Sequence, residues 1–244
     1  MKTNIFLQCL FSLAACSSPK QDKLSESSPM NEKSQSLKSV LDEKKANFEA
    51  KADETKKAVY ADGIQDIINK HVLDNALKVG DKAPNFELTN ATGFSVSLDS
   101  KLKEGPVILM CYRGGWCPYC NLTLQAMQDM LPAFKEKGAT LMALTPEVPD
   151  KSISTKEKND LEFEVLSDLD NNVARAYGVV FELTEEVKSY YENGFGLSEY
   201  NGNDKGELPL AATYFIQLDG TISYAFLDAD YRNRAEPQEI LEAL

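Results

Sequence analysis

The sequence has little histidine and no concentration of basic residues. Its 244 residues include a single histidine, His71, which falls in a helical stretch where an exposed side chain is expected. A Cys–His nucleophile pair is therefore not indicated. The formal net charge is −12, and no basic stripe follows residue 60. Because contact with phosphates needs clustered lysine and arginine, this composition argues against nucleic acid as a partner.

The apolar run near the start is too short to cross a bilayer as a helix. Residues 5–13 follow Lys2 and lead into the small residues of "LAAC". A charged start, a short apolar core and small residues before a cleavage point are typical of a secretory signal. We expect residues 1–15 to be a signal peptide and the protein to be exported.

Cys16 stands directly after the small pair, and this arrangement resembles a bacterial lipoprotein signal. The resemblance implies that Cys16 is acylated and that the protein is lipid-anchored to the cell envelope. Ser17 is not the aspartate that the resemblance associates with the inner membrane, so the outer membrane or the periplasmic face is indicated. An ordinary signal peptide is the alternative. Residues 16–36 are rich in Ser, Lys, Glu and Gln, which predicts a disordered tether.

Residues 37–77 are predicted to form a helical extension. Apolar residues recur on one helical face among lysines and glutamates, at Leu37, Leu41, Phe48 and Ala52. Gly63 is expected to divide the extension into two helices. The apolar stripe packs either on the domain that follows or on a partner chain, as in a homodimer.

Residues 78–244 are predicted to form one α/β domain. Short apolar or alternating runs predict strands at residues 83–88, 94–98, 106–111, 140–144 and 163–168, with a strand hairpin at 213–226. Helical spacing occurs at residues 122–134, 155–159, 171–177, 184–191 and 236–244. Because strands alternate with helices and end in a hairpin, we expect a central mixed β-sheet flanked by helices.

The segment "CYRGGWCPYC" contains Cys111, Cys117 and Cys120. A zinc site commonly needs four Cys or His ligands, and one C-x-x-C without a nearby histidine does not supply them. A structural disulfide across so short a loop would constrain little of the unfolded chain. We therefore interpret Cys117 and Cys120 as a redox-active pair that forms a disulfide, with no metal and no cofactor.

The pair is expected where a buried strand gives way to a helix. Pro118 lacks an N–H and has a helical φ, which favours the first helical position. Cys117 then takes the N-cap and Cys120 the first turn, near the positive end of the helix dipole. Such settings lower a thiol pKa from about 8.5 toward ~7 or below, which favours the reactive thiolate.

Neighbours of the pair have separate expected roles. Arg113 either adds positive potential beside the thiolate or is a solvated loop residue, and the sequence leaves both interpretations open. Trp116 is expected to shield one side of the sulfurs. Cys111 ends the apolar run "PVILMC" and is expected to be an inert core cysteine.

The motif also resembles known families. "WCPYC" between a strand and a helix resembles thioredoxin-fold oxidoreductases, and "YRGGWCPYC" is more similar to peroxiredoxins of the alkyl hydroperoxide reductase superfamily. "LKVGDKAPNFEL", "VARAYGV" and "TYFIQLDGTI" extend the resemblance over residues 78–244, and "FLDADYRNRAEP" resembles a peroxiredoxin-like subgroup with C-x-x-C. A thioredoxin-like fold is implied. On the family's P-x-x-x-T-x-x-C motif, Arg113 takes the proline position, Cys117 the threonine position and Cys120 that of the peroxide-attacking cysteine.

The resemblance implies an antioxidant thiol peroxidase. It would reduce hydrogen peroxide or organic hydroperoxides through a Cys117–Cys120 disulfide, which a thioredoxin-type donor reduces in turn. Ala211 stands where peroxiredoxins carry arginine and thioredoxins a cis-proline, so neither parent activity is matched in full. The alternative is a thiol–disulfide oxidoreductase for proteins outside the cytoplasm, in which Cys117 attacks and Cys120 resolves. A binding or sensor module on the same fold is a third interpretation.

Overall fold

The computed structural model describes residues 35–244. The predicted signal peptide, the predicted lipidation site Cys16 and nearly all of the predicted tether lie outside the described residues. Within residues 35–244, no helix is both long enough and apolar enough to cross a membrane.

Strands and helices follow one another along the described chain. The strands are β1 (Glu87–Thr89), β2 (Ser95–Ser97), β3 (Val107–Cys111), β4 (Thr140–Thr145), β5 (Glu164–Ser167), β6 (Val180–Glu182), β7 (Glu207–Pro209), β8 (Thr213–Ile216) and β9 (Ile222–Phe226). The α-helices are α1 (Leu37–Lys51), α2 (Glu54–Asn69), α3 (Leu98–Leu102), α4 (Pro118–Glu136), α5 (Pro149–Lys158), α6 (Asn172–Ala176), α7 (Glu185–Phe195), α8 (Leu197–Asn201) and α9 (Pro237–Ala243). Short 3₁₀ turns occur at Val72–Asp74 and Leu169–Asn171.

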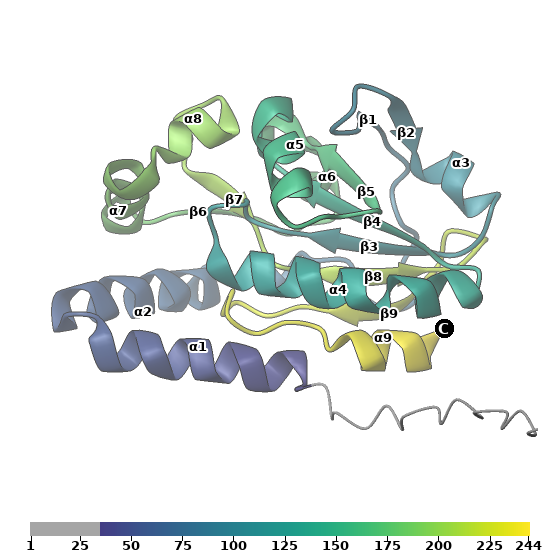
Figure 1. Ribbon diagram of the computed structural model, residues 1–244. Helices are drawn as coiled ribbons and strands as arrows, with labels where there is room; N and C mark the ends of the chain where they lie inside the picture. Colours follow the sequence, from purple (N-terminus) through teal and green to yellow (C-terminus); the bar gives the residue numbers. More distant parts are fainter. Residues whose placement is uncertain (1–34) are drawn as a thin grey trace, which may run out of the picture. The chain divides into compact units, whose positions relative to one another are not determined.

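A five-stranded sheet with the order β5-β4-β3-β8-β9 forms the centre of the domain (Figure 1). β3, β4 and β5 are parallel, β8 is antiparallel to β3, and β9 is antiparallel to β8. Every residue of β3 is buried, as expected for a strand that is covered on both faces. The predicted fold class, a central mixed sheet flanked by helices, is confirmed.

Helices cover both faces of this sheet. Ile108 and Met110 of β3 join one hydrophobic cluster, whereas Leu109 and Cys111 join the other, because successive side chains of a strand point to opposite faces. α1, α4 and α9 contribute to the first cluster and α2, α3, α6 and α7 to the second (Figure 1). The loop from β3 to α4 thus starts at the carboxyl end of a buried strand, where α/β folds build sites.

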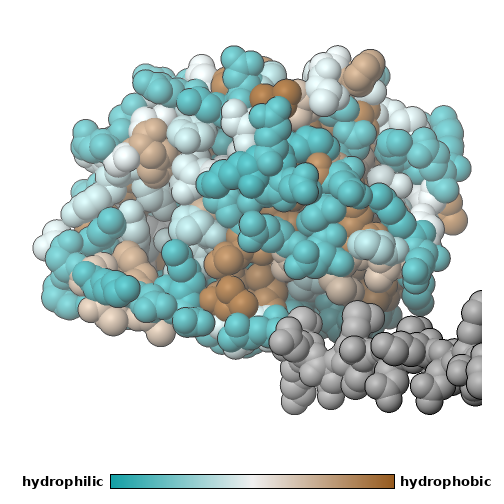
Figure 2. All heavy atoms as spheres, viewed as in Figure 1, coloured by the Kyte–Doolittle hydropathy of each residue, from teal (hydrophilic) through white to brown (hydrophobic). Residues whose placement is uncertain are grey.

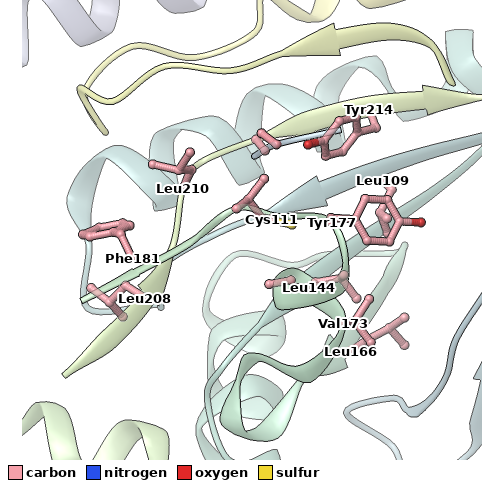
Figure 3. Packing of buried hydrophobic residues seen from close by; sticks show 14 of the residues in the cluster. Leu109, Cys111, Leu144, Leu166, Val173, Tyr177, Phe181, Leu208, Leu210 and Tyr214 are labelled. Carbon is pink, nitrogen blue, oxygen red and sulfur yellow. The ribbon is translucent and has the colours of Figure 1, made fainter. Parts of the chain in front are cut away.

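Cys111 belongs to the hydrophobic core. It packs in the same cluster as Leu144, Tyr177 and Tyr214 (Figure 3). Burial, together with the nearby charge of Asp168, raises the pKa of the Cys111 thiol, so the thiol stays protonated. This placement agrees with the expected inert core cysteine. On the outside, hydrophilic residues cover most of the face shown in Figure 2, with hydrophobic residues in smaller areas.

The helical extension consists of two helices, but they meet earlier than predicted. Ala52 and Asp53 separate α1 from α2, and the carboxylate of Asp53 caps α2 by accepting the backbone N–H of Lys56. Gly63 lies inside α2, where the helix comes close to α7. A Cβ at residue 63 would lie 2.8 Å from Val187 Cγ2, so glycine permits this close packing. The prediction that Gly63 divides the helices was wrong.

The local sequence patterns did not predict every strand and helix. β6 and β7 pair antiparallel as a separate two-stranded sheet, and α7 and α8 lie between them along the chain. Because the two strands are short and far apart in sequence, no local pattern marks their pairing. α5 begins at Pro149, earlier than the predicted helix at residues 155–159.

The start of α1 is fastened to the carboxyl-terminal segment. Glu236 accepts the backbone N–H of Leu37 and that of Lys38, each at 3.0 Å. A carboxylate at this position satisfies free N–H groups and complements the helix dipole. Leu37 and Leu41 are buried in the cluster that contains α4, so this end of the apolar stripe packs on the chain's own domain.

The Glu236→Gln variant is expected to lower the free energy of unfolding by about 1 kcal/mol, because the amide loses one acceptor oxygen and the negative charge at the helix N-terminus. Urea denaturation followed by circular dichroism measures this difference. Glu242→Gln, on the exposed side of α9, is the matched control and should unfold as the wild type does. Identical midpoints for both variants would contradict the role assigned to Glu236.

Candidate active site

Cys117 and Cys120 lie at the N-terminus of α4, as the spacing predicted. Cys117 is the N-cap, and Pro118 is the first residue of the helix. The loop before them requires glycine: Gly114 has a φ of +150°, and a Cβ there would collide with the indole of Trp116. Both sulfur-bearing residues are buried, with Cys117 1% and Cys120 0% exposed.

Arg113 is buried beside the sulfur pair, which excludes the solvated-loop interpretation. Its Nη1 lies 3.9 Å from Cys117 Sγ, and its Nη2 donates to the hydroxyl of Tyr191 at 2.7 Å. The guanidinium carbon lies 4.0 Å from the ring centroid of Tyr231 and 5.0 Å from that of Trp116. These aromatic faces and the tyrosine hydroxyl replace part of the hydration that the buried cation has lost.

A second guanidinium reaches the pair from the carboxyl-terminal segment. Arg234 Nη2 lies 3.5 Å from Cys120 Sγ, and Arg234 Nη1 donates to the backbone carbonyl of Asn233. Arg113 and Arg234 therefore flank the sulfur pair, one beside each sulfur. Arg234 did not emerge from the sequence as a site residue, because only the tertiary fold brings it to the cysteines.

The two thiols of the pair differ in pKa. Burial alone would raise the pKa of Cys117, but the hydrogen bond with Cys120 and the positive charges of Arg113 and Arg234 outweigh it, so the pKa falls well below that of a free thiol. Burial raises the pKa of Cys120, and the neighbouring Cys117 raises it further. These influences favour the thiolate at Cys117 and the protonated thiol at Cys120.

A cavity of about 190 Å³ lies against Cys117. Its wall is mostly aromatic, formed by Phe48, Tyr60, Trp116, Tyr119, Tyr191, Phe195 and Tyr231. Lys44, Lys56 and Arg113 add positive charge to the lining. Of the two sulfur-bearing residues, Cys117 alone lines the cavity, so a ligand there meets the thiolate first.

Glu147 is a buried carboxyl beneath the cysteine loop. Its Oε1 accepts the N–H of Gly115 at 2.9 Å, and its Oε2 accepts the hydroxyls of Tyr112 at 3.2 Å and Thr155 at 3.3 Å. Burial raises the pKa of this carboxyl, although these hydrogen bonds oppose the rise. Glu147 thus fixes the loop that leads to Cys117. Its position just after β4, at the same sheet edge as the end of β3, is the signal that sequence reasoning overlooked.

The other residues considered in the sequence analysis lie in different parts of the structure. Trp116 forms part of the cavity wall together with Cys117, the position expected for a shield. Ala211 is buried two residues before the start of β8. His71 is exposed, near the end of α2. Across residues 35–244, no three His, Cys, Asp or Glu side chains are grouped so that they could hold a metal ion.

Comparison with known proteins identifies the family. The model of the AhpC/TSA family matches residues 79–225, more than half of the chain. The chain belongs to the AhpC/TSA family. The crystal structure of Peroxidoxin BcpB from Mycobacterium tuberculosis superimposes with a TM-score of 0.54 at 22% identity, covering 68% of this chain and 96% of that one. At this identity the likeness shows the fold, which is the thioredoxin-like fold of peroxiredoxins.

Relatives of this AhpC/TSA protein carry names for two different reactions. Peroxiredoxin Bcp of Escherichia coli is 27% identical over 154 residues, which are 63% of this chain and 88% of that protein. Thiol-disulfide oxidoreductase ResA of Bacillus thuringiensis is 30% identical over 108 residues, 44% of this chain, and the chain spans only 61% of the length of ResA. The family match therefore leaves the reaction to be argued from the site.

Alkylation of Cys117 by iodoacetamide should reach half its maximal rate at a pH below about 8.5, the midpoint of a free thiol. Arg113→Gln should move this midpoint to higher pH, because the cation that favours the thiolate is lost. Mass spectrometry of the fragmented peptide distinguishes Cys117 from Cys120. Arg175→Gln, which changes an arginine half-exposed on α6, is the matched control. An unchanged midpoint in Arg113→Gln would refute the support of the thiolate by this guanidinium.

Proposed function

We propose that the chain is a thiol peroxidase that reduces hydrogen peroxide or organic hydroperoxides through a Cys117–Cys120 disulfide cycle. One observation carries the proposal: the Cys117 sulfur lies beside a buried guanidinium and lines a cavity large enough for a small hydroperoxide. Membership of the AhpC/TSA family and the similarity to peroxiredoxin Bcp support the peroxidase.

The cycle has three steps that balance in atoms and electrons. The Cys117 thiolate attacks one peroxide oxygen, the O–O bond breaks, and the departing oxygen takes up a proton to leave as alcohol or water. Cys117 is then a sulfenic acid, and the thiol of Cys120 condenses with it to give the disulfide and a second water. A thioredoxin-type dithiol supplies two electrons that restore both thiols.

This order of steps assigns the attack on the peroxide to Cys117, whereas the peroxiredoxin motif assigns it to Cys120. The lowered pKa of Cys117 and its place in the cavity lining favour Cys117 as the nucleophile. Burial and the adjacent sulfur raise the pKa of Cys120, which suits a thiol that must keep its proton until the sulfenic acid has formed. Because Cys117 is the N-cap of α4 and Cys120 lies in its first turn, the disulfide forms without a long movement of the chain.

Arg113 is the donor that can assist the breaking of the O–O bond. Its Nη1 lies 3.9 Å from Cys117 Sγ, and the residue lines the cavity. A donor that is already oriented stabilises the negative charge that develops on the departing oxygen. Arg113 therefore acts on the thiolate and on the leaving group.

Export and lipid anchoring through Cys16 belong to the same proposal and rest on the sequence of residues 1–16. An anchored peroxidase would meet hydroperoxides at the surface of the cell envelope. Its reductant would be a thioredoxin-like protein of that compartment.

A thiol–disulfide oxidoreductase is the second candidate. The similarity to ResA favours it, as does the lowered pKa of the first cysteine in the C-x-x-C motif. Against it, Cys117 is 1% exposed, so a protein disulfide cannot reach its sulfur unless the aromatic wall moves. The peroxidase needs this movement only when its dithiol reductant docks, because peroxide itself fits the cavity.

Rapid mixing of the reduced full chain with one equivalent of hydrogen peroxide tests both candidates. Cys120→Ser should still consume peroxide once and accumulate a sulfenic acid on Cys117. In Cys117→Ser the rate of peroxide consumption should fall at least about a hundredfold, because the thiolate nucleophile is missing. A dimedone adduct located by mass spectrometry identifies the oxidised sulfur. Cys111→Ser is the control and should behave as the wild type does.

The opposite pattern, with peroxide consumed by Cys117→Ser and not by Cys120→Ser, would reverse the assignment of the two sulfurs. Reduction of insulin disulfides by the wild type, without consumption of peroxide, would replace the peroxidase with the second candidate.

A further inference from the structure

Arg234 reaches the cysteine pair from a segment that the family match does not include. It lies in the loop between β9 and α9, whereas the match ends at residue 225. Its Nη2 lies 3.5 Å from Cys120 Sγ, and its Nη1 donates to the backbone carbonyl of Asn233 at 2.9 Å. Arg234 forms no ion pair with any residue between positions 35 and 244. No carboxylate therefore neutralises the charge that it brings to the sulfur.

Hydrogen bonds within this loop orient the arginine. The carboxylate of Asp228 accepts the backbone N–H of Asp230 at 2.8 Å and the side-chain amide of Asn233 at 2.9 Å. The carboxylate of Asp230 binds Arg232, whose Nε donates to it at 2.8 Å. Both acidic residues of the turn are thus occupied by the turn itself, and Arg234 is left to face Cys120.

The two guanidiniums of the site are divided between the two sulfurs. Arg113 is fully buried beside Cys117, whereas Arg234 is partly buried beside Cys120 and also lines a hollow of about 430 Å³ next to α1. Burial raises the pKa of both thiols. Of the two arginines, Arg113 opposes this rise more strongly at Cys117, and Arg234 opposes it more strongly at Cys120.

Reduction of the Cys117–Cys120 disulfide requires one of its sulfurs to leave. A donor thiolate bonds to one sulfur of a disulfide and expels the other as a thiolate, and a departing thiol of lower pKa leaves faster. Cys117 lines the cavity and Cys120 does not, so the donor meets Cys117 and expels Cys120. A sulfur as buried as that of Cys120 is a poor leaving group unless a nearby cation stabilises its negative charge.

We propose, on the basis of the peroxidase cycle above, that Arg234 is a catalytic residue of the reductive half of that cycle, in which its guanidinium stabilises the departing Cys120 thiolate. The donor thiolate bonds to Cys117 Sγ, the bond between the two protein sulfurs breaks, and its electron pair goes to Cys120 Sγ. The second thiol of the donor gives its proton to Cys120 and attacks the mixed disulfide, which releases Cys117 as a thiolate. The donor departs as a disulfide, and two electrons have passed to the protein.

The reaction of the reduced full chain with one equivalent of 2,2′-dithiodipyridine isolates this step. The chain carries Cys9→Ser and Cys16→Ser, so that these two thiols do not contribute. Cys117 releases a first thiopyridone as it forms a mixed disulfide, and Cys120 releases a second as it closes the Cys117–Cys120 bond. The second release is the attack of the Cys120 thiolate on a mixed disulfide, which is the reverse of the proposed expulsion. Its pH midpoint therefore reports the pKa of Cys120 in the mixed disulfide.

Arg234→Gln should move the pH midpoint of the second release to higher pH. At neutral pH it should also slow the reduction of the disulfide by dithiothreitol by about tenfold, as expected when a hydrogen bond to a charged group is lost. Arg234→Lys keeps the positive charge and should give values between those of Arg234→Gln and the wild type. Arg232→Gln, which removes a charge from the same loop but one that is paired with Asp230, is the matched control and should keep the wild-type midpoint.

The two halves of the cycle can be measured separately in the two arginine variants. Oxidation by one equivalent of hydrogen peroxide should slow more in Arg113→Gln than in Arg234→Gln, because the first guanidinium lies beside the attacking sulfur. Reduction by dithiothreitol should slow more in Arg234→Gln than in Arg113→Gln. Equal losses in both half-reactions for both variants would contradict this division.

An unchanged midpoint in Arg234→Gln, or an equal shift in Arg232→Gln, would overturn the inference and leave the peroxidase intact. A sulfenic acid on Cys120 after rapid mixing with peroxide would also overturn it, because Arg234 would then lie beside the attacking sulfur. Absence of peroxide consumption would overturn the proposed function instead. The exchange with dithiodipyridine uses no peroxide, so it would still decide the role of Arg234.

Discussion

The chemistry of this protein depends on keeping a negative charge on a sulfur that is almost completely buried. Burial by itself raises the pKa of a thiol, and Cys111 displays that effect within the same chain. Cys117 is as buried as Cys111, at 1% exposure each, yet its pKa is lowered. The two cysteines have the same exposure, so the difference in pKa comes from their different surroundings. Cys117 has a hydrogen bond with Cys120 and two nearby guanidiniums, from Arg113 and Arg234, whereas Cys111 has an acidic group nearby.

This arrangement requires Arg113, a cation, to be buried as well, which removes the water around its charge. Its hydration is replaced by the hydroxyl of Tyr191 and by the ring faces of Tyr231 and Trp116. These groups come from α7, the carboxyl-terminal loop and the cysteine loop, so the charge at the sulfur pair depends on packing between segments far apart in sequence. The resemblance to peroxiredoxins places Ala211 where they carry arginine. Here the positive charge reaches the sulfurs from residues 113 and 234 instead.

What could be predicted from the sequence was local. Pro118 after a buried strand was enough to place the start of α4 and the N-cap cysteine, because a few consecutive residues determine both. The prediction of a helix break at Gly63 failed because it used only the low helix propensity of glycine, which is a local property. The packing of Gly63 against α7 is a tertiary contact that the local sequence does not show. The burial of Arg113, the approach of Arg234 and the hydrogen bonds of Glu147 all arise from contacts between distant segments. A single sequence contains no pattern that pairs residue 113 with residue 231.

The enclosure of Cys117 places different demands on the two halves of the cycle. A hydroperoxide needs only the cavity, but a protein dithiol must bring its own sulfur to the Cys117–Cys120 disulfide, and the wall formed by the helical extension and the carboxyl-terminal loop stands in its way. Beyond the Glu236 hydrogen bonds at the start of α1, the polar contacts between these segments are weak. Arg232 reaches Glu49 at 3.4 Å and Lys45 reaches Asp230 at 3.4 Å, and partly exposed pairs of this kind contribute up to ~1 kcal/mol each. Breaking these two ion pairs therefore costs much less than unfolding the domain, which takes about 5–15 kcal/mol in ordinary proteins. An extension that is closed while the peroxide reacts and open while the reductant docks would satisfy both demands with the same two helices.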